Sequence, residues 1–178
     1  MRGEQAWLAG VVPVEAVLAR STIAAIAIRG LVAHPEEFEL TVAAWISPSH
    51  ARRMVASGSQ GVVDAFAVHP GGQVAPEHLH FAIELPDGTT VTDLDHRRAW
   101  RPDQPEARAG LMPRNGSGST TWWEQTYRAW PVPTSGTLTF VCEWPAFAIA
   151  EARYELDAAL VHAASERATP IWPDLSSG

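Results

Sequence analysis

The chain has 178 residues, enough for one domain with a substantial apolar core, and 46% of its residues are hydrophobic. Its 13 basic residues are all arginine, against 20 aspartates and glutamates, so the formal net charge is −7. This balance argues against a protein that grips the phosphate backbone of a nucleic acid. A single cysteine excludes an internal disulfide framework and a zinc site built on several cysteines.

The N-terminal segment does not match a secretory signal, because Glu4 closely follows Arg2 and Pro13 breaks the apolar stretch at residues 6–14. The longest uninterrupted apolar run is Ile23–Ile28. A membrane-spanning helix needs about 20 apolar residues. We therefore expect a cytoplasmic protein that does not enter a membrane.

Residues 22–47 are predicted to form two strands joined by a polar turn at residues 34–37. In the second strand, one face carries Phe38, Leu40 and Val42 and the other carries Glu39, Thr41 and Ala43. This period of two, in a segment rich in β-branched and aromatic residues, is typical of a strand.

Residues 79–94 are predicted to form a hairpin around a turn at residues 86–89. We assign Leu79, Phe81, Ile83 and Leu85 to the core side and His78, His80, Ala82 and Glu84 to the polar side. If Leu85 lies opposite Thr90, counting along the strands places His80 opposite Asp95, within reach of a hydrogen bond.

Three further strands are expected at residues 122–130, 137–144 and 151–156. The second of these is expected to bury Phe140 and Trp144. Residues 157–168 are rich in helix formers and begin with Asp157, a good N-cap, so they predict a C-terminal helix.

Two segments lack clear periodicity. Residues 48–76 suggest a long excursion with one helical turn near residues 50–56, and residues 97–119 are expected to form a surface loop. The whole pattern predicts one domain over residues 1–178. We expect it to be mainly β, an antiparallel two-sheet sandwich of Ig-like type with one C-terminal α-helix.

Three segments of the chain resemble a group of small actinobacterial proteins that have no assigned activity. The resemblance lies in the segment from Gly136 to Pro173, which contains Phe-Val-Cys-Glu-Trp-Pro at 140–145, and in residues 79–88 and 128–133. Together these segments cover just under a third of the chain. The resemblance implies a free-standing folded domain with a sandwich and a C-terminal helix, and it transfers no catalytic residue.

One metal-binding pattern is present. Gly72, His78, His80 and Glu84 have the spacing of the first cupin metal motif. The chain departs from that family because nothing like the second motif follows, and because residues 78–85 are expected to form one unbroken strand. The alternative is a small metal-binding protein or metal-dependent enzyme in which His78, His80 and Asp95 hold a divalent ion.

No catalytic set is favoured. Cys142 is in phase with Phe140 and Trp144, so we interpret it as a small core residue rather than a nucleophile. The chain has no Gly-x-Ser-x-Gly motif and no phosphate-binding loop ending in Gly-Lys-Ser/Thr. We therefore lean against an enzyme and expect no cofactor.

The eight tryptophans offer a second alternative, because carbohydrate-binding sandwiches display flat indole rings on one exposed face. Most of them are expected to pack in the core, namely Trp45, Trp122 or Trp123, Trp144 and Trp172. Trp100 and Trp130 are the best candidates for exposure. The leading hypothesis is a non-enzymatic module that binds another protein or a second copy of itself. The first alternative is the metal-binding protein or metal-dependent enzyme centred on His78 and His80, and the second is carbohydrate binding through exposed tryptophan.

Overall fold

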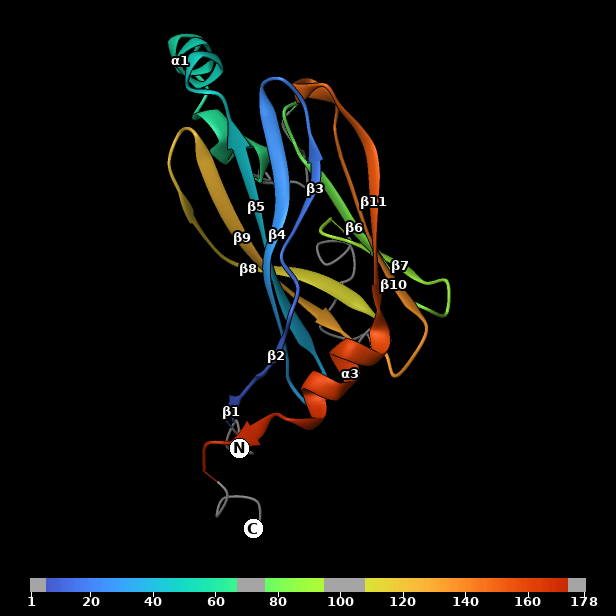
Figure 1. The fold of residues 1–178 in the computed structure, drawn as a ribbon. Coiled ribbons are helices and arrows are strands. Elements are labelled where there is room, and N and C mark those ends of the chain that lie inside the picture. Colours follow the sequence, from blue (N-terminus) through green and yellow to red (C-terminus); the bar gives the residue numbers. More distant parts are fainter. Residues whose placement is uncertain (1–5, 67–75, 95–107, 173–178) are drawn as a thin grey trace, which may run out of the picture.

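The computed structural model describes residues 6–66, 76–94 and 108–172, and it is mainly β. Two antiparallel sheets pack face to face (Figure 1). One sheet has the order β2-β4-β5-β9-β8, with β3 also paired to β4, and the other has the order β11-β10-β6-β7. The predicted mainly β class and the antiparallel two-sheet arrangement are confirmed.

The six-stranded sheet follows the alternation of its sequence. Its strands are β2 (Gly10–Val12), β3 (Ala16–Arg20), β4 (Ala24–Ala33), β5 (Phe38–Ile46), β8 (Gly110–Gly118) and β9 (Trp122–Trp130). Phe38, Leu40 and Val42 are fully buried against the other sheet, as predicted. The two short strands β2 and β3 lie one after the other along the same edge of β4.

The four-stranded sheet consists of β6 (His80–Glu84), β7 (Thr90–Thr92), β10 (Thr137–Trp144) and β11 (Ile149–Asp157). The two sheets meet through aromatic rings. The ring of Phe81 on β6 stacks on that of Tyr127 on β9 with centroids 5.4 Å apart, and it also stacks on Phe140 at 6.5 Å. Phe140 and Trp144 are both completely buried, which confirms the predicted register of β10.

The described residues contain two α-helices, so the prediction of a single helix is wrong. Helix α1 (Pro48–Ala56) begins at Ser47, whose hydroxyl accepts a hydrogen bond from the backbone N–H of His50. Helix α3 (Ala158–Glu166) begins as predicted at Asp157, whose carboxylate accepts from the N–H of Ala159. Two short 3₁₀ helices, η1 (Gly61–Ala65) and η2 (Pro145–Phe147), complete the helical elements of the described residues.

The predicted surface loop at residues 97–119 is wrong in its second half, because residues 110–118 form β8. Backbone pairing with β9 outweighs the weak strand preference of this Gly- and Ser-rich segment, and the register shifts between Pro113 and Gly116. Residues 97–107 of that prediction lie outside the described part of the chain.

Helix α3 covers one end of the sandwich (Figure 1). Val161 and Ala164 are completely buried against the core, whereas Leu160 is 41% exposed. Beyond the helix, β12 (Thr169–Pro170) pairs with β1 (Trp7–Leu8) in a small two-stranded sheet. Trp172 was expected in the core but is 60% exposed, because β12 leads the chain away from the sandwich. No helix within the described residues is long and apolar enough to cross a membrane.

Gly10 marks the closest approach between β2 and α3. A Cβ atom placed on Gly10 would lie 1.9 Å from the carbonyl oxygen of Ala164, which is part of the backbone and cannot move aside easily. We expect Gly10→Ala to lower the free energy of unfolding by about 1–3 kcal/mol in a urea titration, as overpacked sites do. The control is Gly30→Ala, where an added Cβ meets nothing within 4 Å. Equal stability of the two variants would contradict the close packing of α3.

Candidate functional site

The hairpin that carries the predicted histidines is built in a register one residue away from the expected one. Glu84, not Leu85, lies opposite Thr90, and the N–H of Leu85 donates to the carbonyl of Thr89. The loop therefore has three residues, with Gly88 at a φ of 86°. Because a shift of one residue reverses the faces of a strand, Asp93 lies opposite Phe81, on the core side.

His78 is not on the polar side of the hairpin, as was predicted, but 1% exposed in the interior. It precedes β6, where the strand alternation has not yet begun, so His78 and Leu79 are both buried. Its Nε2 lies 3.3 Å from Oδ2 of the buried Asp93, and neither ring nitrogen has a hydrogen-bond partner in the described structure. Burial, together with the Asp93 carboxylate, raises the pKa of the nearby Tyr127 phenol well above its usual value.

The metal-binding alternative gains no support from this arrangement. The rings of His78 and His80 are 5.8 Å apart, but His78 is buried whereas His80 is exposed. Asp95, the third ligand of the alternative, lies outside the described residues. Within those residues, no three His, Cys, Asp or Glu side chains are grouped so that they could hold a metal ion.

Cys142 is buried in the core, as expected, and burial raises the pKa of its thiol from 9.0 to about 11. The raised value means that the folded protein keeps this proton at pH values where the unfolded chain loses it. The contribution to stability is therefore complete below pH 9 and is lost as the pH rises toward 11.

We expect Cys142 to resist a disulfide reagent such as dithionitrobenzoate at pH 8 in the native protein, and to react at once in 6 M guanidinium. In urea titrations, Cys142→Ala should reduce the loss of stability between pH 9 and 11 that the wild type shows. Rapid labelling of the native protein at pH 8 would contradict the burial of the thiol.

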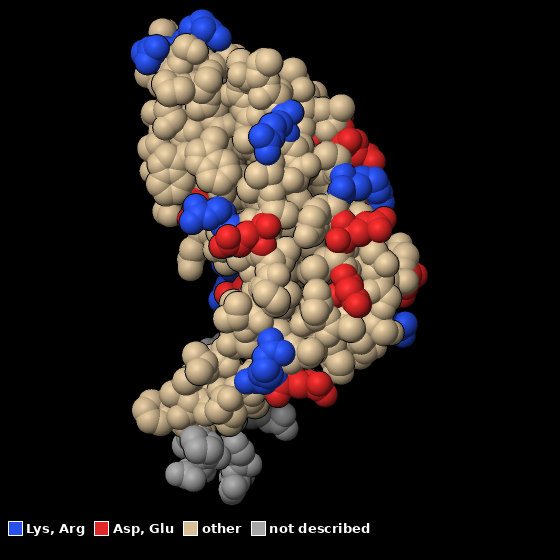
Figure 2. Space-filling model, viewed as in Figure 1, with Lys and Arg blue, Asp and Glu red and all other residues tan. Residues whose placement is uncertain are grey.

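A different candidate lies on the outer face, by which we mean the solvent side of the six-stranded sheet. One half of this face is unusually apolar. We call this part the apolar half, and it consists of Val17, Ala25, Ala27, Trp45 and Trp122. Val17 is 52% exposed and Trp122 36% exposed, and Trp45 lies directly opposite Trp122 on the neighbouring strand. A broad uncharged area occupies the upper part of this face in Figure 2.

The apolar half contains a hollow, which we call the tryptophan hollow, with a volume of about 550 Å³. Trp45 forms one side of it, Ala25 and Ala27 form the floor, and Val17 and Arg20 of β3 lie on the other side. An antiparallel sheet normally alternates apolar residues inside with polar residues outside. Residues 24–28 of β4 are all apolar, so this part of the strand departs from that rule and resembles a strand that is buried on both faces.

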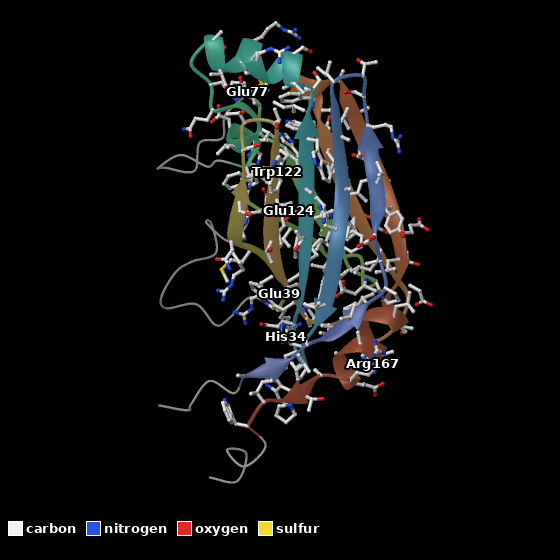
Figure 3. All side chains as sticks on the ribbon, turned by 60° about the vertical axis from the view of Figure 1, so that its left-hand side comes forward. His34, Glu39, Glu77, Trp122, Glu124 and Arg167 are labelled. Carbon is white, nitrogen blue, oxygen red and sulfur yellow. The ribbon has the colours of Figure 1, made fainter. Side chains whose placement is uncertain are left out.

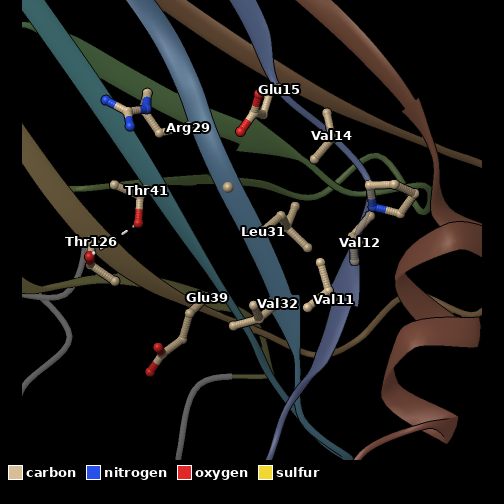
Figure 4. Close-up of a pocket in the computed structure, with 12 residues that line it drawn as sticks. Val11, Val12, Val14, Glu15, Arg29, Leu31, Val32, Glu39, Thr41 and Thr126 are labelled. Carbon is tan, nitrogen blue, oxygen red and sulfur yellow. Dashed lines mark hydrogen bonds between the residues drawn. The ribbon is translucent and has the colours of Figure 1, made fainter.

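The second hollow of the outer face, the valine hollow, lies where β4 has no neighbour on one side (Figure 4). β2 pairs with β4 only up to Leu31 and β3 only from Ile28, so Arg29 and Gly30 face the gap around Pro13. A β-bulge occurs at the same point, where the register with β5 shifts between Ile28 and Gly30. The hollow has a volume of about 620 Å³, and open space lies above its Gly30 floor.

The rest of the outer face, the polar half, is charged. Trp122, Glu124 and Glu39 follow one another down the sheet in Figure 3. Arg29 forms an ion pair with Glu124 at 2.9 Å, and Arg128 forms one with Glu37. The hydroxyls of Thr41 and Thr126 meet across the strands at 3.3 Å. The outer face of this one sheet therefore carries the apolar half next to the polar half.

The expectation that Trp45 packs in the core is wrong. It is half-buried on the outer face, because it continues the phase of Glu39 and Thr41 rather than that of Phe38 and Leu40. That phase is visible in the sequence and could have revealed the exposed ring. Trp130, which was expected to be exposed, is half-buried on the same face, with the guanidinium of Arg128 5.8 Å from its ring centre. Trp100 lies outside the described residues.

Comparison with known proteins found no matching family model, no matching curated protein and no matching solved structure. The resemblance to small actinobacterial proteins therefore stays a prediction. The case for a function rests on the outer face itself.

Proposed function

We propose that the protein is a non-enzymatic binding module that docks another protein, or a second copy of itself, through the apolar half of the outer face. The observation that carries this proposal is the opposed pair Trp45 and Trp122 beside the alanine floor of β4. A contiguous exposed apolar area of this kind marks interaction sites on soluble proteins.

Residue chemistry supports docking over catalysis. Tryptophan is enriched among the few residues that dominate binding energy at protein interfaces, where it fills desolvated pockets of the partner. The small side chains of Ala25 and Ala27 let a partner approach the sheet closely. Within the described residues, the buried ionisable pair His78 and Asp93 lies inside the sandwich, and these two residues line neither hollow of the outer face.

The test is affinity capture from cells that make the protein, with partners identified by mass spectrometry. We expect the wild type to retain a partner that Trp45→Ser/Trp122→Ser loses by about 30-fold or more, since removing two such anchors costs at least 2 kcal/mol. The control variant Val55→Ser/Leu160→Ser removes two exposed apolar side chains elsewhere and should retain the partner. Undiminished capture by the tryptophan variant would overturn the proposal.

A second candidate function is carbohydrate binding. It is favoured by one observation, the two neighbouring indoles of Trp45 and Trp122 above a polar half that offers hydroxyl, carboxylate and guanidinium groups. Titration calorimetry with neutral hexasaccharides such as cellohexaose and xylohexaose separates the two functions. Saturable binding that Trp122→Ala abolishes would favour the carbohydrate function, and its absence favours protein docking.

Three finer predictions accompany the proposal. The cytoplasmic location, the Ig-like form of the sandwich and membership of the actinobacterial group stay predictions from the sequence. A cytoplasmic module with an exposed apolar face would meet its partner inside the cell, where fractionation and capture can detect it.

A further inference from the structure

The valine hollow lies beside the apolar half of the outer face, and Glu15 and Arg29 line both hollows. A partner that covers the apolar half would therefore extend over the valine hollow. What enters this hollow depends on the chemistry of its walls. The question is which side chain of a partner those walls would accept.

One wall of the hollow is apolar. It is formed by Val11 and Val12 of β2 and by residues 13–14 after it, together with Leu31 and Val32 of β4. Val11 is 65% exposed, so its side chain is available to a visiting group. An aliphatic chain of three or four carbons would gain contact along this wall.

Two carboxylates also line the hollow. Glu15 directly follows the apolar segment in the chain and Glu39 lies opposite Val32 on β5, and neither carboxylate forms an ion pair or a hydrogen bond in the described part of the chain. The two nearby arginines are already engaged, Arg29 with Glu124 and Arg128 with Glu37. Among the residues that line the hollow, two glutamates stand against one arginine, which leaves a net charge of −1, so a cationic ligand is favoured over an anionic one.

The floor supplies the space. Gly30 has no Cβ, its φ is not positive, and a Cβ added there would meet nothing within 4 Å. A side chain at this position would project into the hollow rather than into the protein. Arginine and lysine have an aliphatic stem and a cationic end, which matches a valine wall beside free carboxylates.

We infer that the valine hollow receives an arginine or lysine side chain of the partner protein, with its stem against Val11 and Val32 and its charge beside Glu39, which lies opposite Val32 on the neighbouring strand. This inference rests on the proposed docking function and names the partner's chemistry at that same face. It predicts that the segment of the partner that covers the outer face carries a basic residue next to its apolar contacts.

The inference can be tested without the partner. The probe is n-butylguanidinium, which has the end group of arginine, and its uncharged isostere n-butylurea is the control ligand. In amide NMR titrations of ¹⁵N-labelled protein, n-butylguanidinium should shift the signals of Gly30 and Thr41 in a saturable way, with a Kd in the millimolar range, as expected for roughly eight non-hydrogen atoms. n-Butylurea should give no saturable shift.

Variants localise the effect. We expect Glu15→Gln/Glu39→Gln to weaken binding of the probe at least fivefold and Gly30→Val to abolish it, with thermal unfolding confirming that both variants fold. Glu143→Gln/Glu155→Gln, on the other sheet, should bind as the wild type does. Equal shifts with n-butylurea, or unchanged binding to Gly30→Val, would overturn the inference.

The docking function and the basic side chain in the valine hollow can be refuted independently of each other. Trp45→Ser/Trp122→Ser should lose the captured partner and still bind the probe, because neither tryptophan contributes a charge to the hollow. If n-butylguanidinium does not bind but partner capture still depends on the two tryptophans, the inference of a basic side chain in the valine hollow is refuted. The proposed docking function is then unaffected.

Discussion

Replacing Phe140 with alanine is expected to lower the free energy of unfolding by about 3–5 kcal/mol, the usual cost of removing a phenyl ring from a core. Phe140 is completely buried, and its ring lies 6.5 Å from both Phe81 and Tyr154. It thus packs along the inner face of the four-stranded sheet, where the surrounding strands cannot easily close a cavity. Urea titration measures the loss directly.

Two comparisons make the result specific. Val11→Ala, at a side chain that is 65% exposed, should change stability by no more than about 0.5 kcal/mol. Phe140→Leu should fall between the two, since it keeps most of the apolar volume. A cost for Phe140→Ala as small as that of Val11→Ala would mean that the two sheets do not enclose the core as described.

The second large effect is expected at the buried pair of His78 and Asp93. Removing the polar neighbour of a buried imidazole leaves that imidazole in an apolar setting, and a buried polar group without a partner typically costs about 1–3 kcal/mol. We therefore expect Asp93→Ala to destabilise the fold strongly, because Asp93 lies 3.3 Å from Nε2 of His78 and next to the phenol of Tyr127. A conservative substitution, Asp93→Asn, should cost less.

A double-mutant cycle separates the pair from simple packing. His78→Ala/Asp93→Ala should cost less than the sum of the single variants, with a coupling of about 0.5–3 kcal/mol for residues in direct contact. Strict additivity would show that the two side chains contribute independently, and that the buried pair has no energetic role.

Much of the fold could be predicted from periodicity, because a half-buried antiparallel strand must alternate. The bounds of β9 and β10 and the Asp157 cap of α3 all agree with the residues from which they were predicted. These segments carry strong local signals, large side chains on one face or a carboxylate at a helix start, and tertiary packing agrees with them.

The errors have local causes. Only one helical turn was predicted where α1 forms a full helix. Its start is marked in the sequence by Ser47-Pro48, an N-cap followed by proline at the first helical position. The hairpin register failed because a loop of three residues with glycine at positive φ replaces the loop of four that was assumed. Strand β8 has almost no signal of its own and exists because β9 offers it a partner.

The outer face was only partly predictable. Gly30 inside a strand and Pro13 between two short strands both indicate a bulge or break, and the phase of Trp45 indicates an outward ring. That these features share one face depends on the order β2-β4-β5-β9-β8. Strand order is set by contacts between distant parts of the chain, which a single sequence does not display.

The most direct test of the docking surface is site-specific photo-crosslinking in the cells that make the protein. A benzophenone amino acid at Arg20, on the rim of the tryptophan hollow, should form a crosslinked adduct, and Trp122→Ser in the same chain should remove it. The same group at Glu155, an exposed position of β11 on the other sheet, should form none. An adduct at Glu155 in place of Arg20, or one at Arg20 that persists without Trp122, would contradict docking through the apolar half of the outer face.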